Sequence, residues 1–365
     1  MKKFGQESFV VRNGEVEAWV TQLGGHLAPV SFRLGNRWVQ PFSVAPWAEE
    51  PGREDLPAIL RSLRGDFFCM PFGGNSTPFE GERYPVHGEP ANAVWNLDDA
   101  NEGVLDLSFS TTIRPGRVQK RVEIRPGETV VYQTHTVSGM EGPMCYGMHA
   151  TLKFNSTGLL SNSSLAFGKV HPAFESVVQG GYNSLKGGAR FSSLDAVPMA
   201  NGGLADIGEY PAREGYEDLV QVFQDPAEAF SWWAVTFPEE GFVWFQLKNP
   251  RVLSSTVLWH SNGGRHYQPW NGRHRGVLGI EEVTSSFHDG LAESVAPNEA
   301  SEAGFVTSVE LNPEVPLVVK VVFGVAEIPS GFGRVTSVSP VAGGVQLSDS
   351  TSVVFAPLDL EFLTD

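Results

Sequence analysis

Apolar and polar residues alternate along much of this chain, with the period of two that marks β-strands. The segment 117–124 alternates except at Lys120, and a second alternating segment, 129–137, follows the sequence Arg125-Pro126-Gly127-Glu128. Proline presets the backbone of a turn, and glycine accepts the positive φ that the turn requires. We therefore predict that these two segments form a β-hairpin.

Short segments rich in aromatic and β-branched residues recur throughout the sequence, at 15–23, 104–112, 230–237, 242–247, 317–325 and 345–355. Helical periodicity is weak, and its best example is 56–63, with Asp55 as a possible N-cap and Pro57 in the first turn. These patterns predict an all-β protein, a large antiparallel twisted β-sandwich. No composition break and no repeat of 20 to 50 residues is visible, so we expect one domain spanning residues 1–365.

The amino-acid composition agrees with this fold class, and the net charge limits the kinds of molecule that the protein is expected to bind. The 40 glycines and 25 prolines are spread along all 365 residues, and only 19% of the residues are charged. The formal net charge of -16 argues against nucleic acid and anionic membranes as partners, because phosphate binding needs clustered Lys and Arg. A neutral or weakly polar small molecule fits better, although the acidity also serves solubility.

Cysteine usage and the ends of the sequence suggest a cytoplasmic protein. Cys69 and Cys145 lie inside apolar runs and are expected to be buried free thiols. The first residues lack the apolar segment of a secretory signal. No apolar run approaches the roughly 18 to 20 residues that span a bilayer.

Polar residues with chemical potential interrupt the apolar runs in the first third of the chain. Arg64 opens an apolar strand that ends in Pro-Phe-Gly-Gly and Asn75, and it is either a surface ion-pair partner or a fork of donors for substrate oxygens. His87, Asn92 and Trp95 lie within one short segment. Imidazole, amide and aromatic groups together are typical of sugar sites, where polar groups hold hydroxyls and a ring covers the C–H face. The alternative is a turn histidine beside a core tryptophan.

Two further segments supply groups for proton transfer. His149 lies in a strand-like run, where burial and hydrogen bonding can tune it as a general acid, and His171 is a rival for that role. Glu281 and Glu282 close the apolar run that begins at Leu278. Because neighbouring side chains on a strand point to opposite faces, we expect only one of the two to reach the site.

The order of these motifs resembles the galactose mutarotase family, and it is nearest to the hexose-6-phosphate mutarotase-like branch. The resemblance covers most of the chain, from about residue 20 to 281, and rests on Arg64-Gly65, Pro71-Phe72-Gly73, His87-Gly88 with Asn92 and Trp95, Gly147-Met148-His149, and Leu278-Gly279-Ile280-Glu281. It implies a large twisted β-sandwich with its site in the concave face. It also implies an aldose 1-epimerase, which interconverts the anomers of a sugar without a cofactor or a metal.

The same resemblance implies roles for individual residues. His149 matches the general acid and Glu281 the general base, and the two are expected to flank a sugar ring from two sides. Arg64 and His87 match substrate-contacting positions. The substrate-binding residues that we predict are Arg64, His87, Asn75, Asn92 and Trp259, the last of which lies in the ring-rich segment 259–270.

Departures from the family pattern bear on the substrate. Ala91 stands where the sugar-phosphate branch has an arginine, which weakens the case for a phosphorylated sugar because phosphate recognition relies on charge-assisted donors. The arginines that remain to compensate are Arg83, Arg265, Arg273 and Arg275.

The serious alternative is a non-catalytic carbohydrate-binding protein on the same scaffold, since a fold does not fix a function. A glycan-cleaving enzyme needs two carboxylates around the scissile bond and ranks last. His260, His266 and His274 match no zinc-site spacing and are expected to be surface-loop histidines.

Overall fold

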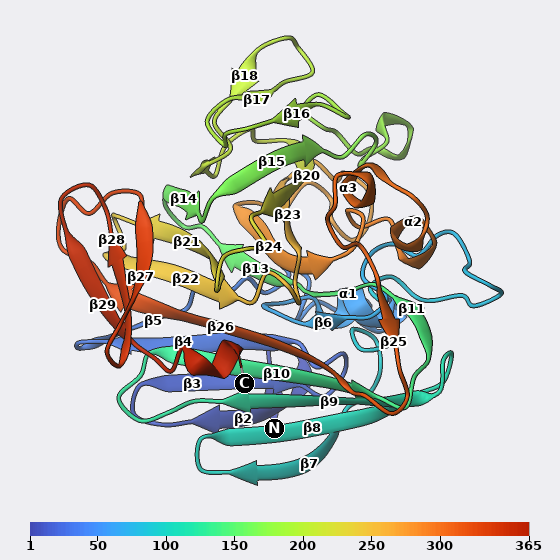
Figure 1. The fold of residues 1–365 in the computed structure, drawn as a ribbon, viewed down its shortest axis with the longest axis horizontal. Coiled ribbons are helices and arrows are strands. Elements are labelled where there is room, and N and C mark those ends of the chain that lie inside the picture. Colours follow the sequence, from blue (N-terminus) through green and yellow to red (C-terminus); the bar gives the residue numbers. More distant parts are fainter. Residues whose placement is uncertain (365) are drawn as a thin grey trace.

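Antiparallel strand pairing builds two large sheets in the computed structural model of the chain, which describes residues 1–364 (Figure 1). The first sheet has nine strands, in the order β19 (Glu209–Tyr210), β14 (Gly158–Asn162), β21 (Ser231–Phe237), β22 (Phe242–Lys248), β26 (Leu317–Glu327), β10 (Val130–Ser138), β9 (Gly116–Glu123), β8 (Val104–Thr111) and β7 (Asn96–Asn101). The second has eight, in the order β16 (Arg190–Phe191), β15 (Leu165–Val170), β20 (Tyr216–Gln224), β23 (Ser255–Asn262), β24 (Val277–Thr284), β12 (Tyr146–Met148) and β6 (Phe68–Cys69), with β13 (Ala150–Lys153) also paired to β24.

Smaller sheets extend this pair. An N-terminal sheet contains β1 (Lys2–Lys3), β2 (Gln6–Arg12), β3 (Val16–Thr21), β4 (Leu27–Leu34) and β5 (Arg37–Val39). A C-terminal sheet contains β27 (Ser337–Val341), β28 (Gly344–Ser348) and β29 (Val353–Pro357). Two ribbons complete the set, β11 (Gly142–Met144) with β25 (Val309–Leu311) and β17 (Val197–Pro198) with β18 (Leu204–Ala205).

Helices are short and lie outside the sheets. They are α1 (Ala58–Ser62), α2 (Leu291–Val295), α3 (Glu299–Glu302) and three single 3₁₀ turns at Arg53–Asp55, Val177–Gln179 and Glu361–Leu363. The predicted helix at 56–63 is α1, but its N-cap is Pro57. Asp55 belongs to the preceding 3₁₀ turn, so the prediction that it caps the helix was wrong.

The predicted antiparallel β-sandwich is confirmed, as is the hairpin of β9 and β10. One predicted strand was wrong, because 345–355 forms two strands, β28 and β29, around a turn. Asp349 makes that turn, since its carboxylate accepts the backbone N–H groups of Thr351 and Ser352. A short polar side chain that bonds its own backbone in this way ends a strand.

Both faces of the nine-stranded sheet are covered, which explains why its central strands are apolar at nearly every position. In β21, Trp233 packs into the core between the large sheets, while Trp232 packs into a second core beneath the C-terminal sheet. The indole Nε1 of Trp233 donates to Thr256 Oγ1 in β23, 2.8 Å away across the first core. Alternation is therefore present in the strand, but both of its faces are buried.

A buried ion pair joins the two large sheets. Lys248 of β22 pairs with Glu282 of β24, and both side chains are fully buried. The lysine also donates to Ser255 O at 2.7 Å, and Thr256 Oγ1 donates to the Glu282 carboxylate at 2.7 Å. Glu282 thus faces the other sheet, away from Glu281, as the alternation of side chains predicted.

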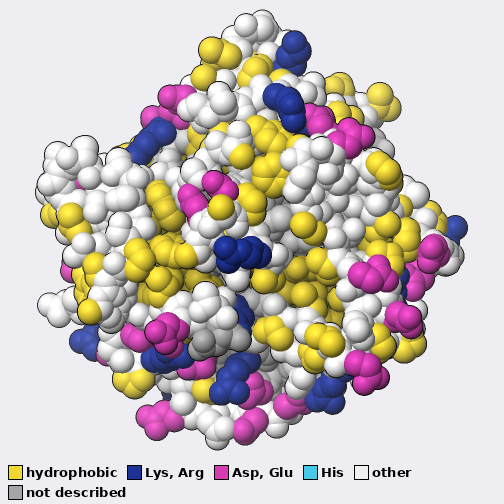
Figure 2. Space-filling model, viewed as in Figure 1, with side chains coloured by type: hydrophobic (Ala, Val, Ile, Leu, Met, Phe, Trp, Pro, Cys, Tyr) yellow, Lys and Arg dark blue, Asp and Glu magenta, His cyan; other side chains and the backbone are white. Residues whose placement is uncertain are grey.

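The surface and the thiols complete this description. On the face drawn in Figure 2, Lys and Arg side chains lie among acidic ones, and apolar side chains fill the areas between them. Cys69 and Cys145 are buried and free, as expected. His260 and His274 are also buried, so the expectation that they are surface-loop histidines was wrong, and only His266 of the three is exposed. Among residues 1–364, the helices are all too short or too polar to span a membrane.

Breaking the ion pair between the sheets should weaken the fold. We expect Lys248→Met to lower the free energy of unfolding by about 3–5 kcal/mol, because it leaves the Glu282 carboxylate buried without its cation. The double variant Lys248→Met/Glu282→Leu should recover most of this loss, since neither charge remains. Urea denaturation of the three proteins measures both effects, and a single variant as stable as the wild type would contradict the prediction.

Candidate active site

Two neighbouring strands bring an imidazole and a carboxyl group into contact. His149 lies between β12 and β13, both of which pair with β24, and Glu281 lies within β24. His149 Nε2 is 3.3 Å from Glu281 Oε1, and both side chains are buried. The expectation that the two groups flank a sugar ring from opposite sides was therefore wrong. They are far apart in sequence but adjacent in the sheet, so they share one wall of the site.

The pair opens into a small pocket with a cavity volume of about 110 Å³. Most of its lining is apolar. The lining residues are Ile59, Leu60, Leu63, Phe67, Val86, His87, His149, Phe174, Leu219, Trp259, Arg265, Trp270, Glu281 and His288. An apolar lining offers few hydrogen-bond partners for the hydroxyl groups of a ligand. The few polar side chains must therefore orient the ligand.

Burial shifts both members of the pair toward their neutral forms. Loss of hydration raises the pKa of Glu281 well above its ordinary value, and the nearby Arg265 opposes this shift. Loss of hydration lowers the pKa of His149 to about 3. At neutral pH the empty site therefore favours a protonated Glu281 and a neutral His149, which together hold one proton.

Aromatic rings fix the position of the His149 imidazole. Phe67 stacks on it with the ring centroids 4.3 Å apart, and the ring of His87 meets its edge at 4.8 Å. His87 has a positive φ of 60°, and its Nδ1 accepts the backbone N–H of Gly73 at 3.3 Å. The next residue must be glycine, because a Cβ at Gly88 would lie 1.9 Å from Met70 O. The His-Gly motif therefore has a structural cause.

Trp259 and Arg265 form the charged part of the lining, and the Trp259 ring lies 5.9 Å from that of His149. Trp259 Nε1 donates to Glu217 Oε2 at 2.8 Å, which fixes the plane of the indole. The Arg265 guanidinium carbon lies 5.1 Å from the centroid of Trp259 and 4.6 Å from that of Trp270. Its Nε donates to Glu175 Oε1 at 2.6 Å. A cation is thus wedged between aromatic faces, where it is attracted by their π-electrons.

Three predicted substrate-binding residues do not reach the pocket. Arg64 donates to the carbonyls of Ser62, Lys3 and Phe4 at 3.0 to 3.1 Å, so its guanidinium holds the N-terminal strand in place. The amide of Asn75 bonds Pro71, Gly73, Pro85 and Leu291, and that of Asn92 bonds Val86, Gly88 and Ile59. These three polar groups form hydrogen bonds with backbone groups of the segments around the site and are not available to a ligand. His87 and Trp259 do line it.

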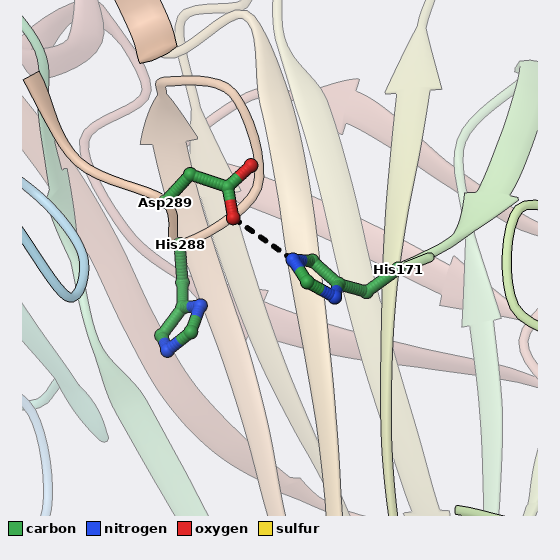
Figure 3. Close-up of side chains that lie close together, drawn as sticks. All are labelled: His171, His288 and Asp289. Carbon is green, nitrogen blue, oxygen red and sulfur yellow. Dashed lines mark hydrogen bonds and ion pairs between the residues drawn. The ribbon is translucent and has the colours of Figure 1, made fainter. Parts of the chain in front are cut away.

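His171, the rival general acid, has a different partner. Its Nε2 lies 2.8 Å from Asp289 Oδ1, and His288 lies beside this pair (Figure 3). Among residues 1–364, these three form a cluster whose ligand atoms all lie within 4.8 Å, as a metal site requires. However, His171 Nδ1 accepts the backbone N–H of Ala173 at 3.1 Å. The ring proton is therefore on Nε2, where it bonds Asp289, and that nitrogen has no lone pair for a metal. The residues fit an Asp–His hydrogen bond better than a metal centre.

Some lining residues escaped the sequence reasoning. His288 and Phe174 follow strands of the eight-stranded sheet without any motif of their own, and only the fold brings them to the pocket. Trp270 was part of the ring-rich segment 259–270, which was the available signal. Arg265 was considered only as a replacement for a missing phosphate contact.

Comparisons with known proteins agree with this architecture. No protein-family model and no curated protein matches the sequence. A structure described as a candidate aldose 1-epimerase from Escherichia coli K12 is similar, with a TM-score of 0.60 and 12% identity over 88% of this chain and 99% of that chain. A galactose mutarotase-like protein from Lactobacillus casei ATCC 334 gives a TM-score of 0.56 and 11% identity over 88% of this chain and 100% of that chain.

A galactose mutarotase related enzyme from Lactobacillus acidophilus gives a TM-score of 0.54 and 10% identity, and covers 88% of this chain and 100% of that chain. At such low identity the likeness establishes the fold alone. The chain has the galactose mutarotase-like β-sandwich fold, and the resemblance expected from the sequence motifs is confirmed at that level.

The placement of Arg64 leads to a test. We expect Arg64→Met to lower the free energy of unfolding by about 2–4 kcal/mol, because three backbone carbonyls lose a charged donor. Ligand binding and any activity per folded molecule should stay unchanged, since the guanidinium lies outside the pocket. Urea denaturation and ligand titration of the variant check both parts. A variant with normal stability that no longer binds the ligand would show that Arg64 contributes to ligand binding.

Proposed function

We propose that this protein is an aldose 1-epimerase, which interconverts the α and β anomers of a small-molecule sugar by acid–base catalysis. One observation carries the proposal: His149 Nε2 and Glu281 Oε1 lie 3.3 Å apart on the wall of a largely apolar pocket. The two oxygens that exchange protons in mutarotation, O1 and O5, are bonded to the same carbon. A base for one of these oxygens and an acid for the other can therefore come from neighbouring positions on one wall, where this pair lies. We retain the cytoplasm as the predicted location.

Ring opening requires two proton transfers. The Glu281 carboxylate takes the proton of the O1 hydroxyl, and the His149 imidazolium gives a proton to the ring oxygen O5. The C1–O5 bond breaks, O1 becomes the aldehyde oxygen, and rotation about C1–C2 exposes the other face of the carbonyl. Closure reverses both transfers and gives the other anomer. No proton is gained or lost over the cycle.

The number of protons held by His149 and Glu281 stays the same throughout this cycle, and burial in the pocket determines which of the two residues carries the proton. The closed sugar needs an ionised Glu281 and a protonated His149, whereas the open aldehyde leaves a protonated Glu281 and a neutral His149. Each state holds one proton in the pair, and the second is the state that burial favours in the empty site. A proton shift across the 3.3 Å contact converts one into the other. Polar substrate hydroxyls would favour the ionised state by replacing lost hydration.

The aromatic lining gives the substrate an orientation. Trp259 and Trp270 line the pocket with aromatic carbon, which suits the C–H groups of a sugar, although Arg265 lies over both rings and His274 stacks on Trp259. His87 touches the His149 ring and supplies a nitrogen for a hydroxyl near the reacting carbon.

Removing either member of the pair should abolish most of the catalysis. We expect Glu281→Gln and His149→Ala each to reduce enzymatic mutarotation by at least ~10²-fold, because each removes one of the two proton transfers. Polarimetry of freshly dissolved aldoses measures the rate above the buffer background. A panel of neutral and phosphorylated aldoses is needed, because His149 and Glu281 act on atoms that all aldoses share and do not determine which sugar is bound.

Matched controls are available on the surface. Glu214→Gln and His266→Ala change the same residue types at exposed positions outside the pocket and should keep full activity. Full activity in Glu281→Gln would refute the assigned base. No acceleration by the wild type on any sugar would instead favour a non-catalytic carbohydrate-binding protein.

The pH profile should lack an inflection at the ordinary histidine pKa. Because burial lowers the pKa of His149 to about 3 and raises that of Glu281, the pair keeps its single proton from about pH 3 to well above the usual carboxyl range. Activity should therefore stay level between pH 5 and 7 and fall on the alkaline side, as Glu281 loses its proton. Mutarotation rates corrected for buffer catalysis test this, and a tenfold decline centred near pH 6.5 would contradict it.

A further inference from the structure

The donors of one pocket arginine are left without partners. Arg265 Nε donates to Glu175, but neither terminal nitrogen of the guanidinium has a hydrogen-bond partner among residues 1–364. The side chain is 15% exposed, and it lines the pocket. Four N–H groups in one plane are thus available to a ligand.

The arginine is also held in a fixed position. Besides Trp259 and Trp270, Phe174 lies under the guanidinium, with its centroid 5.2 Å from the guanidinium carbon. Glu175 is fixed in turn, because its backbone N–H donates to Asn183 Oδ1 at 3.0 Å and its second oxygen accepts the Tyr267 hydroxyl at 3.3 Å. A rigid fork loses little conformational entropy when it binds, so it recognises a planar anion well.

Charge decides which anion fits. Among the residues that line the pocket, Arg265 is the one Lys or Arg side chain, and Glu175 already neutralises part of its charge. A phosphate ester carries close to two negative charges and would be poorly matched. A carboxylate carries one charge, is planar, and accepts two parallel hydrogen bonds from a guanidinium.

We propose that the pocket selects an aldose that bears a carboxylate, a hexuronic acid, and that the terminal nitrogens of Arg265 bind this group. The inference rests on the proposed epimerase function for its reaction, but the binding step can be tested without it. It also assigns the position that determines specificity, because the remaining lining offers a monoanion no second cation.

Paired substrates give the sharpest experiment. We would measure kcat/KM for mutarotation of glucose and glucuronate, galactose and galacturonate, and glucose 6-phosphate. The wild type should prefer each uronate over its neutral parent by about tenfold to a hundredfold, the worth of charge-assisted hydrogen bonds. Arg265→Gln should reduce this preference to less than about threefold, and Arg265→Lys should reduce it in part, because a lysine keeps the charge but not the fork.

Controls separate recognition from folding. Arg275→Gln removes an exposed arginine that pairs with Glu214, and should keep the preference. If Arg265→Gln folds poorly because Glu175 is left unpaired, the double variant Glu175→Gln/Arg265→Gln removes both charges and should show the same lost preference. Equal rates for uronate and neutral parent in the wild type, survival of the full preference in Arg265→Gln or in the double variant, or a stronger preference for the phosphate ester would each overturn the proposal.

Failure of the enzyme function is distinguishable. If no sugar is turned over, calorimetric titration with glucuronate and glucose still tests the carboxylate site. Binding of glucuronate that is lost in Arg265→Gln and retained in Arg275→Gln would support it. Equal binding of the two sugars, or none, would overturn it.

Discussion

The contact between His149 and Glu281 places two ionisable groups side by side where water is largely excluded, and the remaining features of the site follow from this constraint. Neither group can be charged alone without a large desolvation cost, so the pair holds a single proton between them. Phe67 and His87 fix the imidazole ring, while the pairing of Glu281 with Val257 of β23 fixes the backbone that carries the carboxyl group. A pair held in this way is suited to a reaction that moves protons without consuming them.

The strand that carries Glu281 also contributes to a second buried pair, in which both side chains are charged and neither reaches the pocket. Glu282 follows Glu281 directly, yet it faces the other large sheet and meets Lys248. One glutamate thus opens toward a pocket with a neutral partner, and its neighbour is closed within the core with a cation. The alternation of side chains along β24 separates the two environments by a single residue. Adjacent identical residues therefore have a proposed catalytic role and a structural role.

Polar residues around the pocket divide into those that hold loops and those that face the ligand. Asn75 and Asn92 saturate their amides on backbone groups, and Arg64 does the same with its guanidinium. Arg265 and His87 keep donors or ring nitrogens toward the open space. Loops without regular structure leave many carbonyls that need partners, and this need explains why so many promising polar residues have no role in the pocket.

Much of the fold was readable from the sequence, because strand alternation and turn residues act over a few positions. The hairpin of β9 and β10 is an example, as are the two buried cysteines. Where the pattern failed, a local side chain decided the outcome, as Asp349 did by ending a strand. His87, His149, Trp259 and Glu281 could also be selected as site candidates from their motifs. The sequence could not show that His149 and Glu281 lie in contact, since 131 intervening residues separate them and only the pairing of their strands with each other brings them together.

The sequence by itself therefore determined the strands, the turns and the residue types able to transfer a proton, because these depend on local backbone preferences and side-chain chemistry. Only the tertiary structure decided that Arg64 holds the N-terminal strand, that Arg265 lines the pocket and that the side chains of His149 and Glu281 meet. These outcomes depend on which side chains become neighbours when the sheets pack, and on which of them lose contact with water.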